Sequence, residues 1–141
     1  MAEAIARKVA IERGLPEVEA VSAGTSTRDG AAASDGAMLV GLERRLDLGA
    51  HRSQQLTRQL VTWSDLILAM GPSHLERIQQ LGGWDKAYLL TEYPSHDATG
   101  RAVNDPMGED LDVYRATADE LETEIRRVFD RLAAERVPGA S

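Results

Sequence analysis

The amino-acid sequence contains no cysteine among its 141 residues. This absence excludes a disulfide framework, a thiolate-ligated zinc or iron–sulfur site, and a thiol nucleophile within the chain. Positive charge is also scarce, since 16 Lys and Arg stand against 23 Asp and Glu, which gives a net charge of −7. Because nucleic-acid phosphates are bound by clustered Lys and Arg, this balance argues against a nucleic-acid partner.

Long apolar runs are missing as well. No run approaches the roughly 18 residues that a membrane-spanning helix needs, so we expect no membrane partner. The first residues, Met1-Ala2-Glu3-Ala4, carry an acid where a signal peptide would carry basic residues, which predicts a cytoplasmic location. A chain of 141 residues without repeats or linkers predicts a single domain over residues 1–141.

Helices are predicted where apolar residues recur at steps of three and four. One helix starts at residue 2 and stops at Gly14-Leu15-Pro16, because glycine and proline end helices. A second covers 34–46, and a short third covers 73–81. The clearest runs from Leu111 to Leu132 along one apolar stripe.

Strands alternate with these helices. Residues 18–21 alternate apolar and polar side chains, which is typical of a short strand. The nearly continuous apolar runs at 65–70 and 87–90 favour strands that are covered on both faces. Residues 91–110 form a long loop. The alternation predicts the α/β class with a parallel sheet.

The start of the chain does not fit a complete sheet of this kind. Each crossover in a parallel sheet runs from strand to helix to strand, so a strand should precede the first helix. Here the chain enters directly at a helix, which is the first sign of a missing N-terminal strand.

One acidic residue stands in a segment that favours a fixed backbone. Asn104-Asp105-Pro106-Met107-Gly108 lies in the long loop before the last helix. Its composition is that of a turn, since Asp and Pro favour turns and Gly tolerates a positive φ. The same residues would suit a carboxyl held in place to deliver a proton, with Pro106 fixing the backbone beside Asp105.

Two further polar residues follow or connect predicted strands. Ser22 comes after the strand at 18–21, at the sheet edge where α/β proteins bind ligands, and His51 lies in a polar link. Each also has an ordinary structural interpretation, as a strand exit and as a hydrogen-bonded histidine. No histidines pair at metal-ligand spacing, and the acids at 105–112 include residues that suit the N-terminus of the following helix, so we expect no metal and no cofactor.

Taken in order, these segments resemble the low-molecular-weight protein tyrosine phosphatase family over almost the whole chain. The first segment resembles the stretch that directly follows the family's phosphate-binding loop, which runs Cys, five residues, Arg, then Ser-Pro. The others resemble the second-strand exit, the His-containing link, the third strand and the general-acid loop. The segments are Met1-Ala2-Glu3-Ala4, Val21-Ser22-Ala23-Gly24-Thr25, Ala50-His51-Arg52-Ser53-Gln54-Gln55-Leu56-Thr57, Asp65-Leu66-Ile67-Leu68-Ala69-Met70 and Val103-Asn104-Asp105-Pro106.

The resemblance implies a three-layer sandwich around the parallel sheet and a phosphoprotein phosphatase that acts on phosphorylated protein substrates. In that family a thiolate attacks phosphorus, and an Asp protonates the leaving group and then activates water. Asp105 would hold this acid–base role by resemblance. Ser22 and His51 match positions that support the phosphate loop, and Pro106 and Met107 belong to the general-acid loop.

The departure from the family is the absent nucleophile. Neither the cysteine nor its partner arginine exists in this chain, and Met1 stands just after the position of Ser-Pro. We therefore expect a chain truncated after the phosphate-binding loop, without the first strand and inactive as given. An in-frame Cys, five residues, then Arg-Ser-Pro upstream of Met1 in the DNA would support this.

The substrate and the mode of action stay open at this level. Phosphotyrosine is the family default. Met107-Gly108 after the Asp-Pro instead resembles the bacterial subgroup that dephosphorylates phosphoarginine. A non-catalytic pseudophosphatase that binds a partner is a further alternative, whereas the related thioredoxin-coupled arsenate reductases need several thiols and are excluded. The sequence leaves the oligomeric state undetermined.

Overall fold

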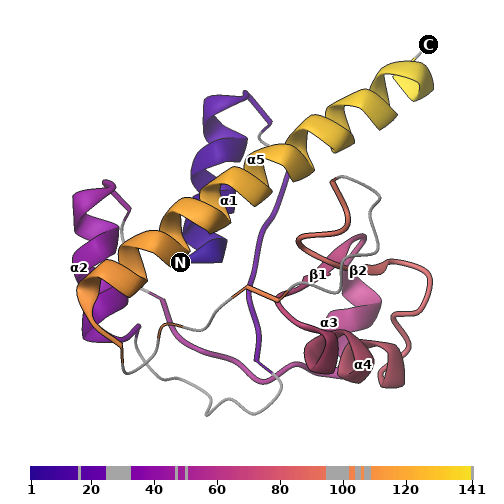
Figure 1. Ribbon diagram of the computed structural model, residues 1–141. Coiled ribbons are helices and arrows are strands. Elements are labelled where there is room, and N and C mark those ends of the chain that lie inside the picture. The colour runs from indigo at the N-terminus through magenta and orange to yellow at the C-terminus, as the bar shows by residue number, and fades with distance from the viewer. Residues whose placement is uncertain are drawn as a thin grey trace.

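The structure is a computed structural model that describes residues 1–15, 17–24, 33–46, 48–49, 51–94, 102–103, 106 and 109–140, with side chains up to residue 134. In these ranges the chain forms five helices and two strands (Figure 1). Their order is α1 (Ala2–Glu12), α2 (Asp35–Glu43), α3 (Arg58–Trp63), β1 (Ile67–Ala69), α4 (Pro72–Gln80), β2 (Ala87–Leu89) and α5 (Leu111–Ala140).

The two strands are parallel neighbours. Ile67 pairs with Ala87 and Ala69 with Leu89, and the chain crosses from β1 to β2 through α4. The Ile67 N–H donates to the Lys86 carbonyl, and the Ala69 carbonyl accepts from Leu90 N–H. Since backbone groups alternate along a strand, those of the intervening Leu68 point away from β2.

Alternate side chains of the strands enter two different cores. Leu66, Leu68 and Leu90 pack on one side, in a core shared with α1 and α5. Ala69 and Leu89 pack on the other side, in a core shared with α3 and α4. The sheet is therefore the middle of three layers, which confirms the predicted α/β sandwich.

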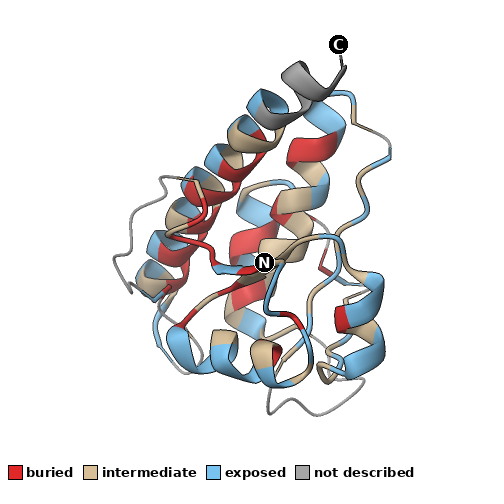
Figure 2. Ribbon diagram, turned by 90° about the vertical axis from the view of Figure 1, so that its right-hand side faces the viewer, coloured by how far each residue is buried: buried red, intermediate tan, exposed pale blue. Residues whose placement is uncertain are grey.

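The layer of α1 and α5 contains the most deeply buried side chains. Figure 2 shows their buried residues turned toward each other. Val9 of α1 is fully buried, and Leu121, Ile125 and Val128 of α5 lie in the same core. At the other end of α5, Tyr114 packs with Val40 of α2 in a separate cluster. Helix α5 thus packs against α1 in one cluster and against α2 in the other.

The prediction of a short strand at Val18–Val21 is wrong. Within the described ranges, residues 18–23 are not assigned to a strand, and only Gly24 forms a bridge, parallel to Gln55. Side-chain alternation is a local property, whereas a strand also needs a neighbouring chain that accepts and donates its hydrogen bonds.

Other boundaries also differ from the sequence expectations. Helix α2 ends at Glu43 rather than at residue 46, because Arg45 adopts φ 61° and Leu46 N–H bonds back to the Gly41 carbonyl. Helix α3 was not predicted: Thr57 caps it through a hydrogen bond from Leu60 N–H at 3.1 Å. Helix α5 continues past Leu132 to Ala140.

Candidate functional site

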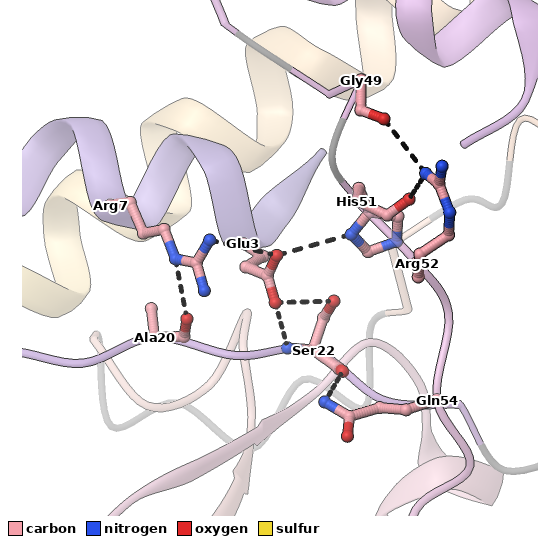
Figure 3. A network of polar contacts seen from close by, with 8 residues as sticks. All are labelled: Glu3, Arg7, Ala20, Ser22, Gly49, His51, Arg52 and Gln54. Atoms are coloured by element: carbon pink, nitrogen blue, oxygen red, sulfur yellow. Dashed lines mark hydrogen bonds and ion pairs between the residues drawn. The ribbon is translucent and has the colours of Figure 1, made fainter. Parts of the chain in front are cut away.

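Two segments that are distant from each other in the sequence meet at the first turn of α1. The segment 20–24 and the segment 51–56 are held together by Gly24, whose N–H donates to the Gln54 carbonyl at 2.9 Å. The Gly24 carbonyl accepts from Leu56 N–H at 2.8 Å. These two bonds fix the strand exit beside the His-containing link, so that Ser22 and His51 face the same helix turn (Figure 3).

Glu3 is the centre of this arrangement (Figure 3). Its Oε1 accepts from the Ser22 backbone N–H at 2.8 Å and lies 3.4 Å from Ser22 Oγ. Its Oε2 lies 3.4 Å from His51 Nδ1. One carboxylate thus connects both residues that the sequence singled out, and it is well shielded, with 15% of its side chain exposed.

The surrounding bonds hold the three segments from outside. The Arg7 side chain donates from Nε to the Ala20 carbonyl at 3.0 Å, and its guanidinium lies 3.6 Å from Glu3. Gln54 Nε2 donates to the Ser22 carbonyl at 2.9 Å. Because Arg7 is 57% exposed, its ion pair contributes little compared with the bonds to Ser22.

The contact with Glu3 also sets the direction of the His51 ring. Nδ1 faces the carboxylate, so Nε2 on the opposite side of the ring points away from it. A histidine bound in this way through one nitrogen presents the other to a neighbouring loop or ligand. The ring is partly shielded, with 22% of its side chain exposed.

Two cavities adjoin the arrangement. A small one of about 190 Å³ lies at Ser22–Gly24 and is also lined by His51, Ser53 and Gln54. A larger one of about 890 Å³ extends from Glu3 along the side of α1 and shares the last three of those residues. The first is large enough for about six waters, so a group of phosphate size fits beside Ser22.

The residues predicted from the sequence have different outcomes. Ser22 and His51 are brought together through Glu3. Pro106 precedes α5, and its carbonyl accepts from Glu109 N–H at 2.9 Å. Asp105 and Met107 lie outside the described residues, so their predicted roles stay predictions.

Sequence reasoning did not identify Glu3 as part of the site. Its only local signal is an acid in the first turn of a helix, which is common because acids stabilise helix N-termini. Its role depends on the segments at 20–24 and 51–56, which no local pattern places beside it.

In the residues that the structure describes, no group of three or more His, Asp or Glu could hold a metal ion. No helix that the structure describes is both long and apolar enough to span a membrane.

Comparison with known proteins gives a consistent result. The family model "Low molecular weight phosphotyrosine protein phosphatase" matches residues 1–137. A protein-arginine-phosphatase of Geobacillus stearothermophilus is 37% identical over 86% of this chain and 82% of its own length. Another from Bacillus subtilis is 35% identical over 96% of this chain and 89% of its own length.

Solved structures agree with the sequence comparison. The YwlE arginine phosphatase from Geobacillus stearothermophilus superposes with a TM-score of 0.86 at 34% identity, covering 97% of this chain and 86% of that chain. A Cys-to-Ser mutant of YwlE with a phosphorylated active-site serine gives a TM-score of 0.88 at 34% identity, over 96% of this chain and 88% of that chain.

The family match begins at residue 1 and does not itself support a missing N-terminal segment, which stays a prediction. The fold, the ordered sequence motifs and the match over residues 1–137 lead to one conclusion: the chain belongs to the low-molecular-weight phosphotyrosine protein phosphatase family.

Proposed function

We propose that this chain is the proton-transfer and supporting part of a phosphoprotein phosphatase, with phosphoarginine as the preferred substrate group. The observation that carries the proposal is the similarity to the two protein-arginine-phosphatases, at 37% and 35% identity over most of their lengths. The tyrosine phosphatase Wzb of Escherichia coli is 28% identical over a comparable span, 85% of its length. Phosphotyrosine is the alternative substrate group.

The proposed reaction needs a thiolate that this sequence does not contain. In the first step a cysteine sulfur bonds to phosphorus, the bond from phosphorus to the leaving nitrogen or oxygen breaks, and Asp105 gives its proton to that atom. In the second step Asp105 takes a proton from water, the water oxygen bonds to phosphorus, and the thiolate and phosphate are released. The YwlE mutant with a phosphorylated active-site serine supports a covalent first step in the family.

The described residues would hold the reacting groups in position. Ser22 and His51 adjoin the small cavity, and Glu3 fixes both of them. Pro106 would hold the backbone next to Asp105, so that less conformational entropy is lost when the acid is aimed. Met107 follows Pro106 in the same loop and would take part in substrate binding or loop support.

The 141-residue chain by itself should show no turnover, because no residue in it can form the phosphocysteine. This absence also favours a second candidate function, a pseudophosphatase that binds a phosphorylated partner without chemistry. The two candidates differ in what happens when a nucleophile is supplied.

The test compares the 141-residue chain with the same chain extended at its N-terminus. The extension carries a strand followed by the family's phosphate-binding loop, which runs Cys, five residues, Arg, then Ser-Pro. We expect no hydrolysis of an aryl phosphate by the shorter chain, and hydrolysis by the extended one. Among phosphorylated proteins, the extended chain should prefer phosphoarginine to phosphotyrosine.

A variant of the extended chain tests the acid. Asp105→Asn should lower kcat by about 10²–10⁴-fold, since this is the range that general acid–base catalysis contributes. Glu109→Gln, a nearby acid before α5, is the matched control and should leave kcat within about twofold. A folded extended chain without activity would refute the phosphatase proposal and leave the binding module.

A further inference from the structure

The larger cavity is an open groove with two kinds of surface. It lies between one side of α1, Val21 and the described residues 45–46, 48 and 51–54. Its apolar part includes Ile11 and Val21, which remain 80% and 39% exposed, together with Leu46 and Leu48. Exposed aliphatic side chains beside buried ones form an apolar surface, and covering it with a ligand lowers the free energy of the system.

Four basic side chains surround this apolar surface: Arg7, Lys8, Arg45 and Arg52. This concentration is unexpected in a chain with a net charge of −7. Lys8 Nζ donates to the Arg44 carbonyl at 3.3 Å, and Arg52 donates to the Gly49 carbonyl at 3.0 Å. Because carbonyls are neutral, these bonds orient the cations without cancelling their charge.

Among the residues that the structure describes, two acids line the groove, and each is paired with a cation. Glu12 forms an ion pair with Arg126 at 3.0 Å, and Glu3 lies 3.6 Å from the Arg7 guanidinium. Arg45, in contrast, forms no ion pair with the residues that the structure describes. The groove therefore keeps an excess of positive charge that an anionic ligand can neutralise.

Arg45 occupies a position where glycine would be easier to accommodate. Its φ of 61° lies in the left-handed region, directly after the end of α2. Glycine commonly holds this position because a Cβ is disfavoured there. Strained backbone positions cluster at functional sites, and this one places a guanidinium at the edge of the groove.

We propose that the groove binds an acidic, apolar-containing segment of a partner protein, the segment that flanks the phosphorylated residue of the substrate. The groove shares His51, Ser53 and Gln54 with the small cavity at Ser22. From Glu3 to Ile11 the helix rises about 12 Å, which matches about four residues of extended chain. Carboxylates would face the basic side chains, and alternate apolar residues would cover Ile11 and Val21.

The inference rests on the proposed function only in assigning the segment to a phosphoprotein substrate. Its test therefore uses an unphosphorylated peptide and the 141-residue chain, for which no turnover is needed. The probe is a fluorescein-labelled peptide of alternating Glu and Leu, and binding is followed by fluorescence anisotropy. Two comparison peptides replace all Glu by Lys, or all Leu by Ser.

We expect saturable binding of the Glu–Leu peptide that weakens with added salt, and weaker binding of both comparison peptides. Arg45→Glu should weaken binding by about fivefold or more. The matched control Arg77→Glu makes the same change in net charge on α4, outside the groove, and should change binding by less than about twofold.

Arg45→Gly separates binding from folding. It removes the cation, so it should weaken binding. It also relieves the strain of a side chain at a left-handed φ, so it should raise the midpoint of thermal unfolding. Equal affinities for the Arg45→Glu and Arg77→Glu variants, or equal binding of the Lys peptide, would overturn the proposal. Displacement by about 10 mM phosphate at constant ionic strength would instead identify a phosphate site. Loss of catalysis in the extended chain with peptide binding intact would count against the proposed function alone.

Discussion

Replacement of Glu3 by Ala should destabilise the protein through the segment at Ser22 rather than through α1 itself. Glu3 accepts a short hydrogen bond from Ser22 N–H at 2.8 Å, and its side chain is only 15% exposed. Hydrogen bonds to charged groups contribute about 1.5–3 kcal/mol. In the variant, water that enters the open groove can accept a hydrogen bond from Ser22 N–H and so offsets part of this loss. We therefore expect a loss of about 2 kcal/mol, which for 141 residues lowers Tm by about 7 °C.

Circular dichroism at increasing temperature measures the shift, and hydrogen exchange of the Ser22 amide reports the local effect. That exchange should accelerate by about 30-fold, the equivalent of about 2 kcal/mol. Glu3→Gln keeps an oxygen acceptor and should cost about half as much as Glu3→Ala. Glu12→Ala, the control on the same helix, removes an exposed ion pair with Arg126 and should cost less than about 1 kcal/mol. Equal Tm values for Glu3→Ala and Glu12→Ala would refute the central role of Glu3.

Three other changes test the packing and the surface charge. Gly36→Ala should lower Tm although alanine favours helices, because its Cβ would clash with the buried Tyr114 ring. Overpacking costs about 1–3 kcal/mol, and an unchanged Tm would contradict this contact. Val9→Ala at the fully buried centre of α1 should lower the free energy of unfolding by about 2–3 kcal/mol in urea titration. Hydrogen bonds from Arg115 lower the pKa of Glu43, so stability from this pair is present at neutral pH and is lost as pH falls through the folded-state pKa. Arg115→Gln should raise the Glu43 pKa toward its ordinary value in a carboxyl NMR titration, and an unmoved pKa would argue against the pair.

The elements that could be predicted from the sequence are those whose signal is local. The apolar stripe of α5 and the buried runs around β1 and β2 are examples, because periodicity reports which side chains are covered. Helix α3 was missed, since only Val61 of its six residues is buried and its main signal is the cap at Thr57. The stretch at Val18–Val21 has the pattern of a strand without the paired neighbours that make one.

The candidate site could be predicted only in part, because some of its contacts leave no local signal in the sequence. Ser22 and His51 follow from ordered motifs, and their resemblance to the family placed them at one site. Their connection through Glu3 depends on two contacts, with residues 19 and 48 positions away from Glu3 in the sequence. A first-turn acid has a sufficient local explanation in the helix dipole, so nothing in its neighbourhood signals a tertiary role.

The one-sided pairing of β1 has a consequence for the behaviour of the protein in concentrated solution. In the part of the chain that the structure describes, β1 pairs with β2 alone, and the backbone groups of Leu68 point to its other edge. Such an edge can template a strand from another molecule. Mutual repulsion of molecules with a net charge of −7 opposes this encounter, and salt shortens the reach of that repulsion from about 10 Å at 0.1 M to about 3 Å at 1 M. Colloidal stability should therefore decline as salt is added, even where the fold itself is unaffected.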